Sequence, residues 1–190
     1  MRSQEMMKAH KLLASMEYQP APVLKGYSGK TLYVNISDNQ IASKPVSSEM
    51  KDLFIGGKGF GLWLLWHGIK DDTTWDSPEN EICISSGPLG GTSSFPGSGK
   101  SLVVSISPTT GSVIDSNVGG HFGPLLKFAG WDAIEIQGKA QQDVIIYIDG
   151  VNRAVTIEEA PLEAIDSHLA AEQFTAMYAE NEADRQNVSV

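Results

Sequence analysis

Cysteine is almost absent from the chain, and this scarcity excludes several kinds of site. Cys83 is the only cysteine among 190 residues. One thiol can neither form an internal disulfide nor supply the thiolates that hold an iron–sulfur cluster. Cys83 lies in an alternating segment from Glu81 to Ile84, so we interpret it as a small buried residue of a strand.

Basic residues and long apolar runs are also scarce. The 14 Lys and Arg stand against 23 Asp and Glu, which gives a net charge of −9, and the acidic residues are concentrated between Glu158 and Asp184. A nucleic-acid partner is not expected, because phosphate binding needs a basic stripe. The chain has no run of about 20 apolar residues to span a bilayer, and its first 20 residues contain no apolar stretch of signal-peptide length. We therefore expect a cytoplasmic protein without a membrane partner.

The remaining composition, with 41% apolar and 19% charged residues, is that of an ordinary globular domain. The first 25 residues lean basic and end near Pro20 and Pro22, so we expect residues 1–25 to form a flexible leader. We expect residues 26–190 to form a single domain, since this length suits one core.

Apolar periodicity predicts an α+β fold that is rich in strands. Period-two alternation predicts strands at residues 31–37, 41–46, 81–86, 102–107, 133–137, 144–149 and 154–157. Helical spacing predicts helices at residues 48–54, 60–68, 119–128 and 166–178.

Two parts of the chain resemble each other. Residues 28–37 match residues 98–107 at seven of ten positions, and the Gly-Gly segment at 55–62 is similar to that at 118–125. Chance similarity between glycine-rich segments is the alternative. The repeated order of elements favours a duplicated domain, with halves at about 26–97 and 98–165 that each hold a strand, a Gly-Gly turn and a helix. We predict that the two halves superimpose.

The glycine-rich segment at 87–100 ends in Gly-Lys-Ser, as a nucleotide-binding P-loop does. The P-loop pattern requires glycine at the position of Ser94, and its lysine should open a helix, whereas residues 102–106 alternate like a strand. Nucleotide triphosphate hydrolysis is therefore not expected.

The same segment nevertheless suits an anion. Glycines let backbone amides approach an oxyanion, and a helix start adds partial positive charge, which we expect at Gly119. Lys100 would add a full charge, while Asn117 would either contact the ligand or simply cap the helix. The predicted strand and turn between them should bring Lys100 and Gly119 side by side. No nucleophile–base pair and no metal site can be named, because the histidines lack ligand spacing.

The order of the motifs resembles the N-terminal domain of the tungsten-containing aldehyde ferredoxin oxidoreductases. Six motifs between residues 26 and 160 carry the resemblance: FIGGKGFG at 54–61, SPEN at 77–80, GPLGGTS at 87–93, SPTTG at 107–111, GGHFG at 119–123 and LKFAGWDAIEIQGKA at 126–140.

This resemblance implies a β-rich, duplicated base for a bis-pyranopterin cofactor that carries tungsten or molybdenum, with magnesium bridging the pterin phosphates. It also implies oxidation of aldehydes to carboxylic acids, with electrons passing through one [4Fe–4S] cluster to ferredoxin. By position, Lys100, Asn117 and Gly119 fall on the family's pterin-contacting residues.

The sequence departs from the family in two respects. Lys100 stands where the family has arginine, which exchanges a planar fork for a point charge. The family also continues for several hundred residues, and its cluster cysteines lie beyond this chain. We therefore expect a split subunit, a truncated gene product or an expressed fragment that is inactive alone and takes its cluster cysteines from a second polypeptide. A homo-oligomer stays open, and so does a non-catalytic pterin-binding or scaffold protein derived from the domain.

Overall fold

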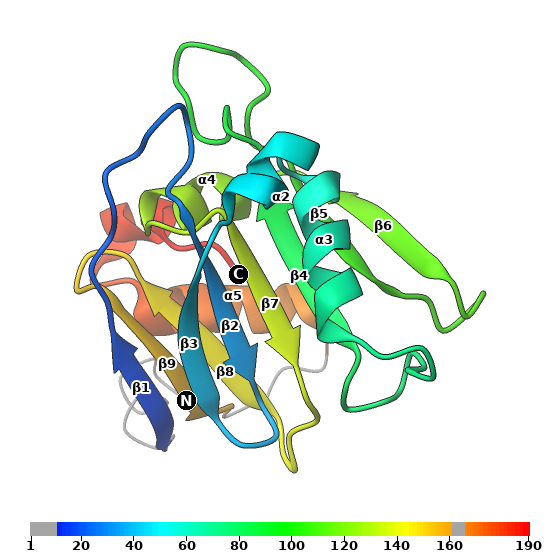
Figure 1. Cartoon of the computed structure of the whole chain (residues 1–190). Helices are drawn as coiled ribbons and strands as arrows, with labels where there is room; N and C mark the ends of the chain where they lie inside the picture. Colours follow the sequence, from blue (N-terminus) through cyan, green and yellow to red (C-terminus); the bar gives the residue numbers. More distant parts are fainter. Residues whose placement is uncertain (1–10, 161–165) are drawn as a thin grey trace.

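Alternating apolar residues build two β-sheets with helices packed against them, in an α+β fold (Figure 1). The computed structural model describes residues 11–160 and 166–190. The larger sheet has the order β3-β2-β7-β4-β5-β6 and the smaller one β1-β9-β8. The larger sheet consists of β2 (Lys30–Asn35), β3 (Gln40–Pro45), β4 (Glu81–Ser86), β5 (Ser101–Ile106), β6 (Val113–Val118) and β7 (Ala133–Gln137). The smaller sheet consists of β1 (Leu12–Glu17), β8 (Val144–Asp149) and β9 (Ala154–Glu159).

The helices connect these strands or follow them. They are α2 (Ser48–Leu53) and α3 (Lys58–Gly68) before β4, α4 (Phe122–Phe128) before β7, and then α5 (Ser167–Tyr178) and the 3₁₀ helix η1 (Glu182–Asn187). The Ser47 hydroxyl caps α2 and the Asp166 carboxylate caps α5, each accepting from an amide that a helix start leaves free. None of the helices in the described ranges has the length and apolar character needed to cross a bilayer.

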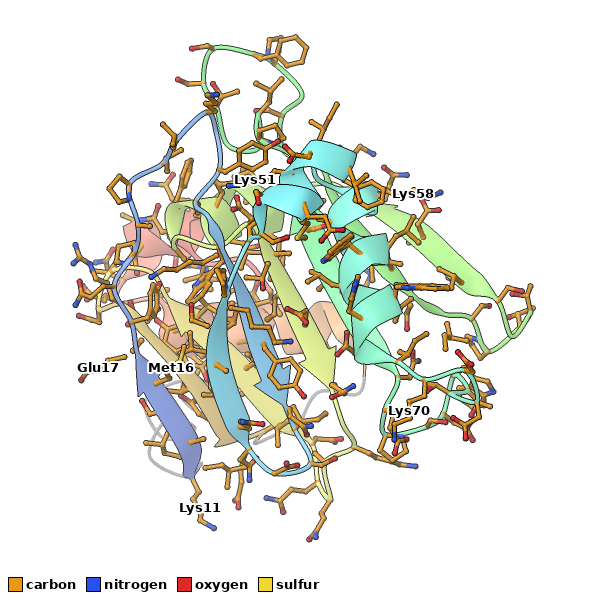
Figure 2. The ribbon with its side chains drawn as sticks, viewed as in Figure 1. Lys11, Met16, Glu17, Lys51, Lys58 and Lys70 are labelled. Atoms are coloured by element: carbon orange, nitrogen blue, oxygen red, sulfur yellow. The ribbon has the colours of Figure 1, made fainter. Side chains whose placement is uncertain are left out.

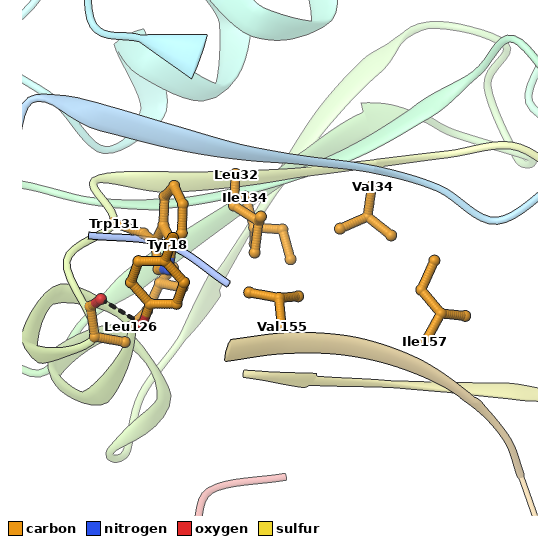
Figure 3. Packing of buried hydrophobic residues seen from close by; sticks show 9 residues of the cluster. Tyr18, Leu32, Val34, Leu126, Trp131, Ile134, Val155 and Ile157 are labelled. Carbon is orange, nitrogen blue, oxygen red and sulfur yellow. Dashed lines mark hydrogen bonds between the residues drawn. The ribbon is translucent and has the colours of Figure 1, made fainter. Parts of the chain in front are cut away.

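One apolar core lies between the two sheets (Figure 3). Leu32, Val34 and Ile134 of the larger sheet face Val155 and Ile157 of the smaller one, and each is at most 2% exposed. Because side chains alternate along a strand, the residues between them point to the opposite face of the larger sheet. The two-sheet arrangement therefore depends on one set of alternate positions in each strand.

A second core lies on that opposite face, under α3. Phe60 of α3 packs with Cys83 and Val104, and all three are fully buried. Gly61 allows this close approach, since a Cβ there would lie 2.7 Å from a methyl group of Val104. Cys83 is thus the buried strand residue that the sequence predicts, and its burial raises the pKa of the thiol well above its ordinary value.

The expected repetition is present in the order of elements. Each half contains a hairpin, a Gly-Gly segment, a helix and a returning strand, and both repeated segments form strands, β2 and β5. The returning strands differ in direction, however. β2 runs parallel to β7 and therefore antiparallel to β4, the returning strand of its own half, whereas β5 runs antiparallel to β4 and parallel to β7. The predicted superposition of the halves therefore does not extend to their returning strands.

The halves are also interlocked. In the larger sheet β7, from the second half, lies between β2 and β4 of the first, and β4 lies between β7 and β5. The central pair of the sheet, β7 with β4, therefore joins the two halves.

The prediction of a flexible leader at residues 1–25 is wrong for its described portion. Leu12–Glu17 forms β1, which pairs with β9, and Tyr18 then donates a hydrogen bond of 2.7 Å to the carbonyl of Ala129. The pairing partner of β1 lies about 140 residues away, so no local signal marks it as a strand. The first ten residues lie outside the described part of the chain.

Candidate functional site

The strand register gathers the glycine-rich loops at one end of the larger sheet, which we call the glycine end. Ser86, the last residue of β4, pairs with Ser101, the first of β5, and Ser101 pairs with Val118, the last of β6. The loop at 87–100 and the segment that follows β6 therefore leave the sheet together. Figure 1 shows the 87–100 loop projecting at this end, above α4.

Two further segments complete the glycine end. Gly57, at the start of α3, donates to the carbonyl of Ser86, so the first Gly-Gly segment lies beside the 87–100 loop. The turn at 24–29 reaches the same loop, since a Cβ at Gly26 would overlap the carbonyl oxygen of Pro88. Glycine is required at this contact, because any side chain would displace the loop.

Lys100 and Gly119 lie side by side, as the sequence predicted. They directly flank the paired residues Ser101 and Val118. The neighbouring glycines also touch, because a Cβ at Gly99 would lie 2.8 Å from the carbonyl oxygen of Gly120. The hairpin of β5 and β6 returns the chain to its starting edge and so causes this approach.

Asn117 belongs to a strand, and the interpretation that it caps a helix is wrong. It lies in β6, opposite Leu102, and α4 begins only at Phe122, after an N-cap at His121 that makes no side-chain hydrogen bond. The sequence did not indicate β6 because all six of its residues are exposed at the edge of the sheet and show no buried alternation. Asn117 still lies next to the glycine end, because it is one residue before Val118, the last residue of β6.

Lys100 differs from Lys30 and Lys58 in having no partner among the described residues. Lys30 donates to the carbonyl of Gln19 at 2.6 Å, and Lys58, labelled in Figure 2, forms an ion pair of 2.6 Å with Asp115. The exposed Lys100 side chain makes no hydrogen bond or ion pair with any residue that the structure describes. Its charge is therefore available to a ligand.

Two buried hydroxyls lie beneath the glycine loops. Ser86 and Ser101 are 2% and 1% exposed, and within the described residues their Oγ atoms have no hydrogen-bond partner. A Cβ at Gly90 would lie 2.9 Å from Ser86 Oγ, and one at Gly123 would lie 3.5 Å from Ser101 Oγ. Buried polar groups without a partner usually mark a water or ligand position, so this end of the sheet has unused hydrogen-bonding capacity.

The sequence does not indicate a buried ion pair that lies beside the turn at 24–29. Lys127 of α4 and Asp132, before β7, are 6% and 0% exposed in their side chains, with Nζ and Oδ1 2.5 Å apart. Both residues belong to the quoted motif at 126–140, but nothing in the local pattern shows that a charged residue is buried.

A second buried charge cluster lies away from the glycine end, under α3. Glu81 and Glu135 are 1% and 2% exposed, and Lys44 forms an ion pair of 2.7 Å with Glu135. Burial, with the nearby Glu135 carboxylate, raises the pKa of Glu81 to about 7. The described residues contain no group of three or more His, Cys, Asp or Glu arranged to hold a metal ion.

Two hollows lie outside the glycine end. One of about 450 Å³ lies between α4, β8 and the C-terminal helices, and another of about 440 Å³ lies along α2 and α3, beside the 79% exposed Trp66. Neither is lined by Lys100, Asn117 or Gly119. Lys100, Asn117 and Gly119 are all exposed, so the predicted site lies on the surface of the loops.

Comparison with known proteins gives consistent relatives. Residues 31–189 match the family model described as the N-terminal domain of aldehyde ferredoxin oxidoreductase. A tungsten-containing aldehyde ferredoxin oxidoreductase of Pyrococcus horikoshii is 43% identical over 127 residues, which cover 67% of this chain and 21% of the relative. A Pyrococcus furiosus protein named aliphatic sulfonate oxidoreductase, WOR-like subunit, is 34% identical over 137 residues, with 70% of this chain and 21% of the relative covered.

A solved structure gives the same result. The active site complex BamBC of benzoyl coenzyme A reductase, determined with 1,5-dienoyl-CoA, matches with a TM-score of 0.67 and 30% identity. The match covers 81% of this chain and 21% of that chain. The chain thus spans about a fifth of the length of the relatives that it matches.

Proposed function

The chain belongs to the aldehyde ferredoxin oxidoreductase family, whose N-terminal domain it matches, and from this premise we propose that it is the cofactor-holding portion of a tungsten-containing oxidoreductase. The observation that carries the proposal is the glycine end, where the unpaired Lys100 lies beside Gly119. An exposed cation among glycine-rich loops suits a ligand with phosphate groups. Lys100, Asn117 and Gly119 are the residues that we propose for binding.

The residues present fit a pterin cofactor with phosphate groups. Lys100 can donate to a phosphate oxygen, and the backbone amides near Gly119 have no side chain in the way, since a Cβ there would meet open space. The Ser86 and Ser101 hydroxyls supply further hydrogen-bonding capacity beneath the loops. A magnesium ion between pterin phosphates is part of the proposal, and its ligands would come largely from the phosphates themselves.

The bound tungsten or molybdenum centre supplies the oxidation–reduction chemistry, and the protein supplies binding and orientation. Lys100 would neutralise phosphate charge, and the glycine loops would let the backbone approach the ligand closely. The described residues suggest no catalytic group of their own at this end, so the proposal gives the chain a binding role.

The substrate proposal rests on the names of the relatives. Aldehyde oxidation to carboxylic acid, with ferredoxin as electron acceptor, follows from the aldehyde ferredoxin oxidoreductase relatives. Other relatives are named for aliphatic sulfonate and for benzoyl coenzyme A. The same domain therefore accompanies different substrates, and residues beyond it would select among them.

A second polypeptide that carries the cluster cysteines belongs to the proposal, as does a cytoplasmic location. Cys83 is fully buried, and its thiol is a poor thiolate because its pKa is raised. It is therefore unsuited to hold a cluster. The alternative function is a non-catalytic pterin-binding or scaffold protein, which would need no cysteine-bearing partner.

The test is elemental and pterin analysis of untagged protein purified from its source, with identification of every chain that accompanies it. We expect stoichiometric tungsten or molybdenum, pterin, and a partner that binds an iron–sulfur cluster. Pterin without such a partner would favour the scaffold alternative. Protein that contains neither pterin nor metal, although it is isolated with its partners, would contradict both.

A further inference from the structure

The ion pair between Lys127 and Asp132 is unusual in its depth. Taking two charges out of water costs several kcal/mol for each ion, and a well-packed apolar pair often stabilises a fold as well. Stability alone therefore does not explain a pair whose side chains are 6% and 0% exposed. The contacts of the pair show what else it does.

Apart from the ion pair itself, the side-chain hydrogen bonds of these two residues within the described structure all end on the turn at 24–29. Asp132 accepts from the amides of Ser28 and Gly29, at 3.0 and 2.7 Å. Lys127 Nζ donates to the carbonyl of Gly26 at 3.1 Å. The pair thus holds both the donors and the acceptor of a segment about 100 residues earlier in the sequence.

The turn has a well-defined shape. Leu24 and Tyr27 exchange two backbone hydrogen bonds, and the residues between them, Lys25 and Gly26, have φ values of 53° and 84°. Positive φ at both central positions is typical of the tight type I′ turn. The hydrogen bonds at Gly26 and Ser28 therefore fix the position of the whole turn.

The turn at 24–29 also contacts two of the glycine loops. Gly26 lies against the carbonyl of Pro88, in the loop after β4. The Tyr27 hydroxyl donates to the carbonyl of Ile55 at 2.7 Å, in the segment before α3. The buried pair is thus connected, through one rigid turn, to both loops.

We propose that Lys127 and Asp132 are positioning residues, which set the glycine loops at 55–57 and 87–91 for ligand binding by holding the turn at 24–29. This inference rests on the proposed function, because the ligand is the phosphate-bearing pterin. Neither residue touches the ligand. Their effect on binding passes through Gly26 and Tyr27.

The experiment compares two double variants. Lys127→Met with Asp132→Asn removes both charges together, which avoids leaving one buried charge unpaired. The control, Lys44→Met with Glu135→Gln, removes the ion pair of β3 and β7, in which Glu135 is buried and the Lys44 side chain is 45% exposed, and which lies away from the glycine end. Both chains are examined with and without their native partner.

The first measurement is amide hydrogen exchange on the isolated chain. We expect the Lys127/Asp132 variant to melt cooperatively, while exchange at 24–29, 55–57 and 87–91 rises about tenfold or more and the core of β4 and β7 is unchanged. The control should leave exchange in the three loops at the wild-type level. Unchanged loops in the Lys127/Asp132 variant would overturn the proposal, whether or not pterin binds.

The second measurement is pterin content of the complex. We expect the Lys127/Asp132 variant to retain about a tenth of the wild-type content or less, and the control to retain all of it. Full retention in a folded Lys127/Asp132 variant would overturn the positioning role. Pterin missing from the wild-type complex as well would instead contradict the proposed function, and the exchange measurement would still decide the role of the pair.

A third variant serves if the double variant does not fold. Tyr27→Phe keeps the aromatic ring, which stacks on Phe60 at 6.0 Å, and removes only the hydrogen bond to Ile55. We expect faster exchange at 55–57 and weaker pterin retention, with little change in melting temperature. Wild-type exchange and retention would show that the turn does not position this loop.

Discussion

A single lysine carries much of the proposed ligand binding, because its charge is not used within the described fold. Lys100 follows the long glycine loop, whereas the related residue of the first half, Lys30, donates to the carbonyl of Gln19. The two lysines occupy equivalent places in the repeated sequence but have different tasks. Lys30 supports the fold, and Lys100 is available to a ligand.

We predict that Lys100→Ala lowers pterin retention in the assembled protein by about 1.5–3 kcal/mol, the usual contribution of a charge-assisted hydrogen bond. Lys100→Arg should be neutral or better, because a planar fork binds phosphate at least as well. Metal and pterin contents of the purified complexes measure both effects.

The control is Lys70→Ala. Figure 2 shows Lys70 beyond α3, at the end of the helix away from Lys58, so this variant removes an equal charge far from the glycine end. Lys30→Ala is unsuitable, since it would also break the bond to Gln19. Equal pterin content in the Lys100→Ala and wild-type complexes would remove Lys100 from the site.

A second prediction concerns Glu81. Because its pKa is raised to about 7 in the folded chain, the folded state holds this proton more tightly than the unfolded state. Its contribution to stability is therefore present below the ordinary glutamate pKa and is lost as the pH rises toward 7. The loss amounts to about 3 kcal/mol at most, by the free energy of a pKa change.

Glu81→Gln should abolish this part of the pH dependence. The free energy of unfolding is measured with denaturant at pH 4.5 and pH 8. Between these pH values it should fall by up to about 3 kcal/mol more in the wild type than in the variant. Glu79→Gln, at an exposed neighbouring position, should show no such gain. A wild type and Glu81→Gln variant whose stabilities run parallel with pH would contradict a raised pKa.

Buried polar residues were the part of the site that sequence could not indicate. The partners of Asp132 are amides at Ser28 and Gly29, about 100 residues earlier, and only the folded chain brings them together. The approach of Lys100 and Gly119 was predictable, since the strand and turn expected between them direct the chain back toward its starting edge, although the second strand of the hairpin was not foreseen. The sequence therefore predicted a contact between nearby segments, but not the burial of charged residues by segments that are distant in the chain.

At the scale of elements, β1 and β6 were missed for different reasons. β1 depends on β9, far along the chain, whereas β6 has a near partner in β5 but no buried side. The other strands were predicted because their apolar residues alternate and are at least partly buried. Periodicity thus reveals a strand only where burial imposes it.

We predict that β1 contributes to stability. Deletion of residues 1–17 would uncover one edge of β9 and expose part of the core between the sheets, to which Leu13, Ala14 and Met16 contribute. The free energy of unfolding should fall by more than about 2 kcal/mol, as is typical when core contacts are lost.

Deletion of residues 1–10 is the control, because it shortens the chain and keeps β1. Chemical denaturation of both shortened chains measures the difference. If the shorter deletion alone accounts for the whole loss, or if neither deletion has an effect, β1 does not stabilise the fold.

At the scale of the whole molecule, the chain should not transfer electrons alone. Its one thiol, Cys83, is buried and has a raised pKa, so it cannot hold a cluster. We predict that the purified chain shows no iron–sulfur absorbance after anaerobic reconstitution and does not reduce a dye with aldehydes. Visible spectra and dye assays test this, and aldehyde-dependent activity of the pure chain would refute it.

The sequence indicated most elements of the molecule but not how they join. Strand order within a sheet depends on which distant edges meet, and the parallel pairing of β2 with β7 joins residues about 100 positions apart. A repeated sequence suggested two self-contained halves. The chain instead places the returning strand of each half next to the hairpin of the other.

This exchange of returning strands has a consequence for how the protein is made. A fragment ending at residue 97 would contain β4 without either of its neighbours, and a fragment starting at residue 98 would contain β7 without either of its own. Neither piece can complete the larger sheet, so a chain emerging from the ribosome must wait for β7 before β2 of its first hairpin is paired on both sides. Expressed singly, the pieces should remain unstructured and vulnerable to proteases. Expressed together, the two pieces should fold by complementation, because each contains the strands that pair with the returning strand of the other.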